Sequence, residues 1–231
     1  DYMAFDNLPQ VINPASGYIH SANQTPFRVS AEADNPNKDD YAIEDGFPTR
    51  MTNRADRGLE LLAELESISE QQFFDIKHDK KYSVNSRAYA YLQQAASADL
   101  GAIQGDNLQS YQDAQTLITN WDLSTDIENR GAALSACVLG GEWLSEQRGS
   151  DAQKALDELV RCTDLLMSTS GRIDPLWGDV NRHVRGDLNI PVAGGRDTLR
   201  AIYGMGMEKD GYLTNVAGDG LYYQVSWDAQ G

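Results

Sequence analysis

The spacing of apolar residues changes twice along the chain, and this change most constrains the folds open to it. Between positions 53 and 170 apolar residues recur every three or four positions, which is typical of amphipathic helices. Positions 1–52 are instead rich in Pro, Asn, Gly and Asp, and glycine becomes frequent again after Gly171. We therefore expect an α+β protein in three segments: strand and loop over 1–52, helices over 53–170, and loop with a returning strand over 171–231.

The middle segment divides into several predicted helices. Ser69 followed by Gln72 has the pattern of a capping box, in which two side chains close the first turn of a helix. The expected helices cover 54–66, a stretch beginning after Ser69, 86–101, 107–119, 128–146 and 150–169. Outside this segment, Gly17–His20 is a short extended run, and Leu221–Trp227 has the composition of a strand.

The charge balance excludes some classes of partner. The chain has 231 residues and a formal net charge of −16, whereas nucleic acids and anionic membranes bind basic patches. No apolar run approaches the roughly 18 residues of a membrane span. The first residues, Asp1-Tyr2-Met3-Ala4, lack the basic start and apolar stretch of a signal peptide, so we expect the chain to begin either mature or inside a longer protein.

The two cysteines leave two interpretations open. Cys137 and Cys162 each lie in an apolar helical pattern, which fits two buried thiols. It equally fits a disulfide between neighbouring helices, which would need an oxidising compartment. There is no CxxC motif and the three histidines lie far apart, so the sequence argues against a zinc site.

No motif in the chain forms a self-contained active site, but two groups of polar residues stand out. Asn13 to Asn23 frames a polar turn region. An asparagine there either caps a turn, which the residues alone favour, or directs its NH₂ group at a developing oxyanion. Arg50, Arg54 and Arg57 have the spacing of a stripe on a helix surface.

Five blocks of sequence, in order, resemble the β chain of the penicillin acylase family, which includes penicillin G, cephalosporin, aculeacin-type and acyl-homoserine lactone acylases. Together these blocks cover nearly the whole chain. They are Leu8–Ile19 with Ala22–Phe27; Arg50–Arg57 leading into Leu61-Leu62; Asn120-Trp121-Asp122 with Arg130–Leu134; Trp177–Arg182 and Arg185–Val192 with Gly194-Gly195; and Gly218-Asp219-Gly220 with Tyr222–Val225.

The resemblance implies an N-terminal-nucleophile hydrolase with an αββα core, to which the two end segments would belong. In such enzymes a chain-terminal Ser attacks the amide and its own α-amine is the base. Asn23 matches the family's oxyanion donor, and Arg54 matches the arginine that organises the nucleophile's surroundings, although a slipped alignment would exchange it with Arg50 or Arg57. Asp219 matches a late acidic residue that pairs with a histidine near the nucleophile.

The resemblance also sets expectations for partners and cofactors. Asp1 has no hydroxyl or thiol, so we expect the chain to be an internal piece of a β chain, inactive alone, with the α chain and the start of the β chain as its partners. The expected substrate is a small N-acyl amide, with a preference for the acyl-homoserine lactone or aculeacin-type branch. No cofactor is required, but Asp34 has the spacing of a Ca²⁺ ligand in some members.

The implied location is the periplasm or the cell exterior. The alternative is a catalytically inert helical binding or scaffold module.

Overall fold

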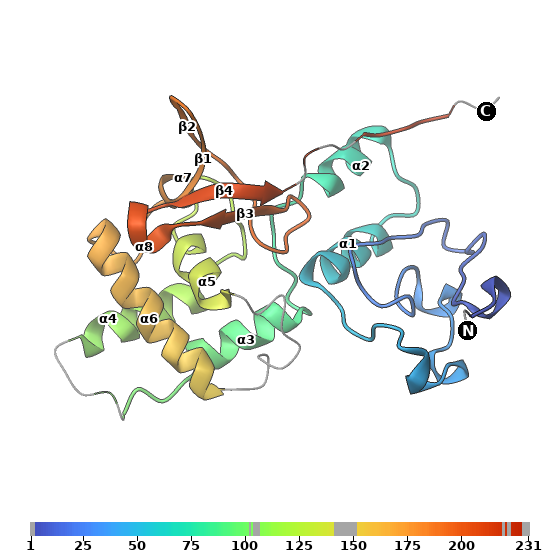
Figure 1. Ribbon diagram of the computed structural model, residues 1–231, viewed down its shortest axis with the longest axis horizontal. Coiled ribbons are helices and arrows are strands. Elements are labelled where there is room, and N and C mark those ends of the chain that lie inside the picture. The colour runs from blue at the N-terminus through green and yellow to red at the C-terminus, as the bar shows by residue number, and fades with distance from the viewer. Residues whose placement is uncertain are drawn as a thin grey trace.

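The computed structural model describes residues 3–101, 103, 107–140, 152–218, 220 and 223–227. It shows an α+β protein in which a group of packed helices lies beneath a small mixed sheet, while the N-terminal segment lies to one side (Figure 1). The α+β fold class expected from the sequence is confirmed. The division at positions 52 and 170 stays a prediction. None of the helices in the described ranges is long and apolar enough to cross a membrane.

The N-terminal segment, residues 3–52, is loop with short 3-10 turns, and its described residues contain no strand. The turns are η1 (Phe5–Asn7), η2 (Glu32–Asp34), η3 (Lys38–Asp40) and η4 (Ile43–Asp45). The strand expected around Gly17–His20 is therefore wrong. Gly17 closes a turn onto the carbonyl of Pro14 with a φ of +78°, and the Asn35 side chain, rather than a neighbouring strand, accepts from the backbone N–H groups of Val29 and Ser30.

Helices α1 (Asn53–Ala63) and α2 (Glu70–Lys77) follow. The Thr52 side chain caps α1 by accepting from the N–H of Ala55. The capping box predicted at Ser69 and Gln72 is confirmed. Helix α1 ends three residues before the predicted boundary at 66, and α2 is short because its last turn closes at His78.

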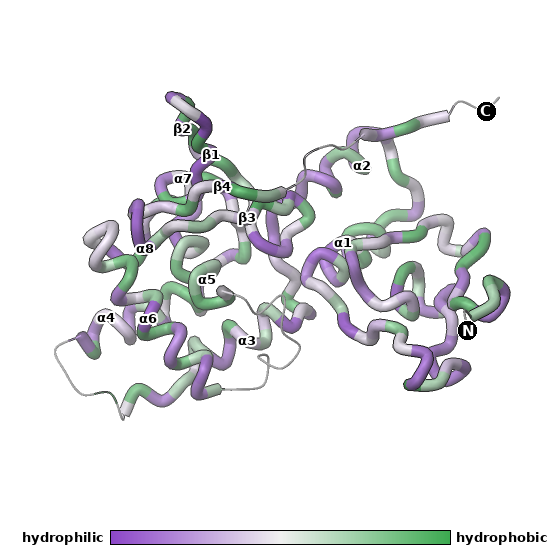
Figure 2. The backbone as a smooth tube through the Cα atoms, viewed as in Figure 1, coloured by the Kyte–Doolittle hydropathy of each residue, from purple (hydrophilic) through white to green (hydrophobic). Residues whose placement is uncertain are grey.

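The helical core consists of α3 (Arg87–Ala96), α4 (Leu108–Thr119), α5 (Ala132–Leu139) and α6 (Ala152–Ser170). Helix α5 is buried along most of its length, and Figure 2 shows it as mainly hydrophobic. It begins at Ala132 rather than 128, because the Asn129 side chain accepts from the N–H groups of Gly131 and Ala132. The helix ends before Gly140, which has a positive φ; positions 141–146 of the prediction lie outside the described residues.

A disulfide between Cys137 and Cys162 joins α5 to α6, with their Cα atoms 5.8 Å apart. Of the two interpretations of the cysteines, the structure therefore confirms the disulfide. Cys162 is fully buried in the helical core, and disulfides of this kind are typical of oxidising compartments.

The C-terminal third holds the sheet, in the strand order β2-β1-β4-β3. Its elements are α7 (Trp177–Val180), β1 (Asn181–Arg185), β2 (Leu188–Pro191), β3 (Ile202–Met205), α8 (Met207–Asp210) and β4 (Leu213–Gly218). Strands β1 and β2 form an antiparallel hairpin, β1 runs parallel to β4, and β3 is antiparallel to β4.

The predicted strand over Leu221–Trp227 is wrong for its described residues. Residues 223–227 are in no strand and run outward past α2 (Figure 1), where the Gln224 side chain bonds to the carbonyl of Glu70. The strand that pairs is β4, a few residues earlier. A run of strand-forming residues becomes a strand only where a neighbouring strand supplies backbone partners.

Candidate functional site

Asn23 and Arg54, two of the residues that the resemblance marks as site residues, lie in contact. Arg54 Nη2 donates to Asn23 Oδ1 at 3.0 Å. Asn23 is exposed and has a φ of +63°, a conformation that asparagine tolerates better than most residues. Arg54 stands in the first turn of α1, so the contact joins the N-terminal loop to that helix.

A third residue, Asp197, completes this cluster, and sequence reasoning missed it. Arg54 Nε donates to Asp197 Oδ1 at 3.0 Å, with side-chain exposures of 18% for Arg54 and 4% for Asp197. Asp197 lies in the loop between β2 and β3, 143 positions from Arg54. The sequence offered only the preceding Gly194-Gly195 turn as a signal. We call Asn23, Arg54 and Asp197 the Asn23 site.

The rest of Asp197 is bound to the start of α1. Its Oδ2 accepts from the backbone N–H of Asn53 at 2.7 Å, and its carbonyl accepts from Asn53 Nδ2 at 2.7 Å. Asn53 Oδ1 in turn accepts from the N–H of Ser83 at 2.8 Å. Burial raises the pKa of Asp197, and the Asn53 N–H and the Arg54 guanidinium oppose that rise.

The loop that carries Asn23 is fixed on both sides of that residue. Thr52 Oγ1 donates to the carbonyl of Ala22 at 2.9 Å, and the N–H of Thr25 donates to the carbonyl of Arg50 at 2.8 Å. Gln24 Nε2 donates to the carbonyl of His20 at 2.8 Å. Asn23 is thus an exposed residue between buried, hydrogen-bonded neighbours.

His20 packs directly on α1. Its ring stands where a Cβ on Gly58 would be, with Nε2 only 2.4 Å from that position. Burial lowers the pKa of His20, so the ring is neutral near pH 7. Gly58 therefore allows the N-terminal loop to approach the helix closely.

The structure separates the three arginines that the sequence left exchangeable. Arg54 binds Asn23, whereas Arg57 pairs with Asp79 at 3.1 and 2.9 Å. Arg50 lines a different hollow, together with Arg28 and Asp56. Asp56 is 7% exposed and meets Arg28 at 3.4 Å, and burial raises its pKa to about 6.

Two other predicted residues have different outcomes. Asp219 lies outside the described residues. Both carboxylate oxygens of Asp34 accept backbone N–H groups, from Ala15 at 3.0 Å and Ser16 at 2.9 Å. Hydrogen bonding by the Ser16 side chain, and then by its backbone, lowers the pKa of Asp34. The described residues contain no group of three or more His, Cys, Asp or Glu side chains placed to hold a metal. Asp34 thus acts as a turn acceptor in this structure, and its role as a Ca²⁺ ligand stays a prediction.

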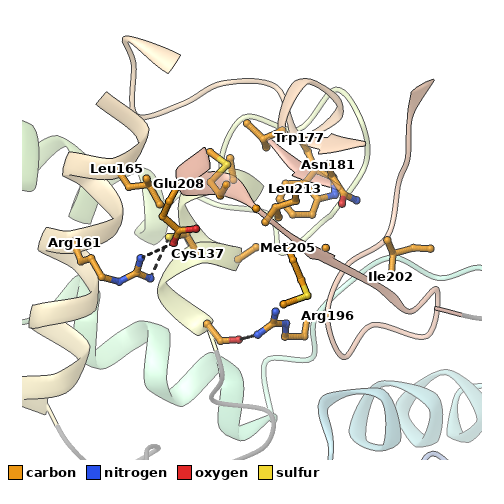
Figure 3. Close-up of a pocket in the computed structure, with 17 residues that line it drawn as sticks. Cys137, Arg161, Leu165, Trp177, Asn181, Arg196, Ile202, Met205, Glu208 and Leu213 are labelled. Atoms are coloured by element: carbon orange, nitrogen blue, oxygen red, sulfur yellow. Dashed lines mark hydrogen bonds and ion pairs between the residues drawn. The ribbon is translucent and has the colours of Figure 1, made fainter. Parts of the chain in front are cut away.

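A hollow of about 300 Å³ lies between α5, α6 and the sheet, beside the disulfide (Figure 3). Its walls are mainly apolar, and its two arginines already have partners. Arg161 faces Glu208 at 3.9 Å, and Arg196 donates to the carbonyl of Gly140. These pairings leave it less suited to a charged ligand.

The geometry of the Asn23 site fixes the orientation of one amide. A guanidinium only donates hydrogen bonds, so the Asn23 atom facing Arg54 is the oxygen and the NH₂ group points elsewhere. Among the described residues, Asn23 Nδ2 has no hydrogen-bond partner. The site therefore presents an oriented, solvent-accessible donor, which suits a negatively charged oxygen.

The chain also matches a known protein family. A family model described as penicillin amidase matches residues 1–229, almost the whole chain. The chain belongs to the penicillin amidase family.

Proposed function

We propose that this chain is part of an amidohydrolase that cleaves N-acyl amides, with Asn23 Nδ2 donating to the oxyanion of the tetrahedral intermediate. The family is one of acylases. The observation that supports the role of Asn23 is its hydrogen bond from Arg54, which orients the amide before substrate arrives. Preorganised donors of this kind cost little reorganisation during reaction.

Each residue of the Asn23 site has a separate proposed role. Asn23 touches the reacting oxygen. Arg54 positions Asn23, and Asp197 positions Arg54 through its Oδ1 while anchoring the start of α1 through its Oδ2. Asp219 is the proposed partner of a histidine near the nucleophile. The Ser nucleophile and its α-amine would come from the preceding part of the β chain, and the α chain would complete the acyl pocket.

The mechanism that these residues support has two halves. The Ser oxygen attacks the amide carbon, its proton passes through the α-amine to the leaving nitrogen, and the acyl-enzyme forms. Water then attacks the ester and releases the acid. Asn23 would stabilise the oxyanion in both halves, since the same oxygen becomes negative in each.

The finer substrate assignment is an acyl-homoserine lactone or aculeacin-type amide with a long acyl chain. It rests on the likeness of the Arg185–Gly195 loop and the Gly218–Trp227 region to that branch. The proposed location is the periplasm or the exterior, which the Cys137–Cys162 disulfide supports. Release of fatty acid from N-acyl substrates by the full protein would bear out the assignment, whereas efficient cleavage of penicillin G without such release would contradict it.

The experiment is Asn23→Ala in the full-length protein, assayed for amide hydrolysis under saturating substrate. We expect kcat to fall by about 10²- to 10³-fold. Asn37→Ala is the matched control, because Asn37 is exposed and caps only the short η3 turn; it should retain full activity. Unchanged hydrolysis in Asn23→Ala would favour the inert scaffold instead.

A further inference from the structure

A second hollow, of about 580 Å³, lies between the C-terminal end of α2 and the sheet. Strand β2 and the residues after it supply much of its apolar wall, including Ile190, Pro191 and Val192. Five polar side chains line it: His78, Lys80, His183, Arg200 and Asn215. We call it the Asn215 pocket.

Asn215 is the most informative residue in this pocket. It lies in β4 and is only 4% exposed. Neither its Nδ2 nor its Oδ1 forms a hydrogen bond within the described part of the chain. A buried amide without partners costs free energy, and nearly all buried polar groups in native proteins are partnered. A ligand oxygen that accepts from Nδ2 would remove part of this cost.

Arg200 supplies the charge. Its Nη1 is buried and has no hydrogen-bond partner among the described residues. Its backbone is held firmly, with its N–H donating to the carbonyl of Asp79 at 3.0 Å and its carbonyl accepting from Thr198 Oγ1 at 2.8 Å. A guanidinium remains charged at any physiological pH and matches oxygen anions in shape.

The surrounding charges reinforce this preference. Among the residues described, no carboxylate lines the pocket, although the chain carries a net charge of −16. Lys80 is paired with Asp126 just outside, so Arg200 is the main source of positive charge. The hollow beside the disulfide differs, because its arginines are already paired.

We propose that the Asn215 pocket binds a small organic anion. A carboxylate or phosphate oxygen would accept from Arg200 Nη1 and Asn215 Nδ2, while an apolar body would lie against Ile190, Pro191 and Val192. This site does not depend on the Asn23 site, and it assigns a ligand class to side chains that the acylase mechanism leaves unused.

The binding test uses the full-length protein and calorimetry with three probes: hexanoate, phenyl phosphate and neutral hexanamide. We expect saturable binding of at least one anion and at least tenfold weaker binding of hexanamide. The tighter anion identifies the oxygen group. The proposal would be overturned if neither anion showed saturable binding, or if hexanamide bound as tightly as the anions. A pocket filled by another part of the polypeptide would give the first of these results.

Variants assign the binding to this pocket. Arg200→Gln should weaken anion binding by about 10- to 100-fold, because a charge-assisted bond is lost. Arg172→Gln is the matched control, since Arg172 is an exposed arginine paired with Asp174, and it should bind as the parent does. Equal affinity in Arg200→Gln and the parent would contradict the proposal.

Asn215→Leu tests whether Asn215 contacts the ligand or only supports the fold. Replacing an unpartnered buried amide by a similar apolar side chain should raise the melting temperature of the ligand-free protein while removing the ligand-induced shift. A retained shift would exclude Asn215 from the site. Asn23→Ala should bind the anion normally, so failure of the acylase proposal and failure of this one give different results.

Discussion

The Asn23 site and the Asn215 pocket are both polar regions, but they differ in how far the protein satisfies its own groups. In the Asn23 site, Asp197 uses both carboxylate oxygens and Arg54 bridges two partners. In the Asn215 pocket, a buried amide and a buried guanidinium nitrogen have no partner among the described residues. The first region is already organised without a ligand, whereas the second leaves its hydrogen-bonding capacity open.

This difference predicts opposite responses to mutation. Removing a group from a fully connected polar network leaves its partners unsatisfied and destabilises the fold. Removing a buried polar group that has no partner removes the free-energy cost of burying it and stabilises the fold. We therefore expect substitutions in the Asn23 site to lower the free energy of unfolding and Asn215→Leu to raise it.

The largest loss should come from Asp197→Ala. It leaves the half-buried charge of Arg54 and the N–H of Asn53 without their acceptor, and we expect the free energy of unfolding to fall by about 3 to 5 kcal/mol. Denaturant unfolding of the full-length protein measures this. Asp157→Ala, which removes only an exposed contact with Gln153, is the control and should change stability by less than about 0.5 kcal/mol.

Asp197→Asn tests the cause of that loss. The variant keeps the shape and tolerates the φ of +60° at this position, so its loss should be smaller than that of Asp197→Ala. An equal loss in both variants would show that charge, rather than the hydrogen-bonded shape, determines the stability of the Asn23 site.

The disulfide lies outside both regions, and its removal gives a loss of stability with which the others can be compared. Replacing Cys137 and Cys162 by Ser removes a cross-link spanning a sequence separation of 25, which should lower the free energy of unfolding by about 3 kcal/mol. Thermal unfolding with and without reductant checks the same quantity in the parent. Insensitivity of the parent to reductant, with both thiols then titratable, would contradict this prediction.

Asp56 is a buried carboxylate near the Asn23 site. Its ion-pair partner Arg28 is 56% exposed, and burial raises the pKa of Asp56 from 3.8 to about 6. The folded state therefore holds this proton more tightly than the unfolded state. The stability that protonated Asp56 contributes is fully present below about pH 4 and is lost as the pH rises through about 6.

Asp56→Asn should remove this dependence, because asparagine does not ionise. As the pH rises from 4 to 7, the free energy of unfolding of the variant should increase by about 2 kcal/mol relative to that of the parent. Urea unfolding of both proteins at the two pH values gives the difference. A constant difference between them would mean that Asp56 titrates near its ordinary pKa.

The sequence predicted features that depend on neighbours along the chain. The capping box at Ser69 and Gln72 is an example, since its two side chains are three residues apart and close the same turn. Asn23 and Arg54 were each marked as site residues only by the family resemblance, and their hydrogen bond was not predicted, since nothing in the spacing of 31 positions brings them together. Their proposed catalytic roles stay predictions.

The features that the sequence could not predict depend on distant partners. Asp197 meets Asn53 across 144 positions, and no local pattern marks such a contact. The error at Leu221–Trp227 has the same origin. Residues 213–218 and 221–227 both contain strand-forming side chains, but β4 lies between β1 and β3, whereas residues 223–227 have no neighbouring strand in the described structure.

The smallest predicted effect concerns Gly58, where the N-terminal loop approaches α1. Alanine inside a helix is normally more stable than glycine by about 1 kcal/mol, but a Cβ here would lie 2.4 Å from His20 Nε2. We therefore expect Gly58→Ala to leave the free energy of unfolding no higher than that of the parent. The displaced His20 ring should shift the Asn23 loop and lower the acylase kcat a few-fold.

The double variant Gly58→Ala with His20→Ala makes room for the methyl group. Relative to His20→Ala alone, it should recover the gain of about 1 kcal/mol in denaturant unfolding. A full gain in the single Gly58→Ala variant would show that His20 moves aside freely and does not hold the loop.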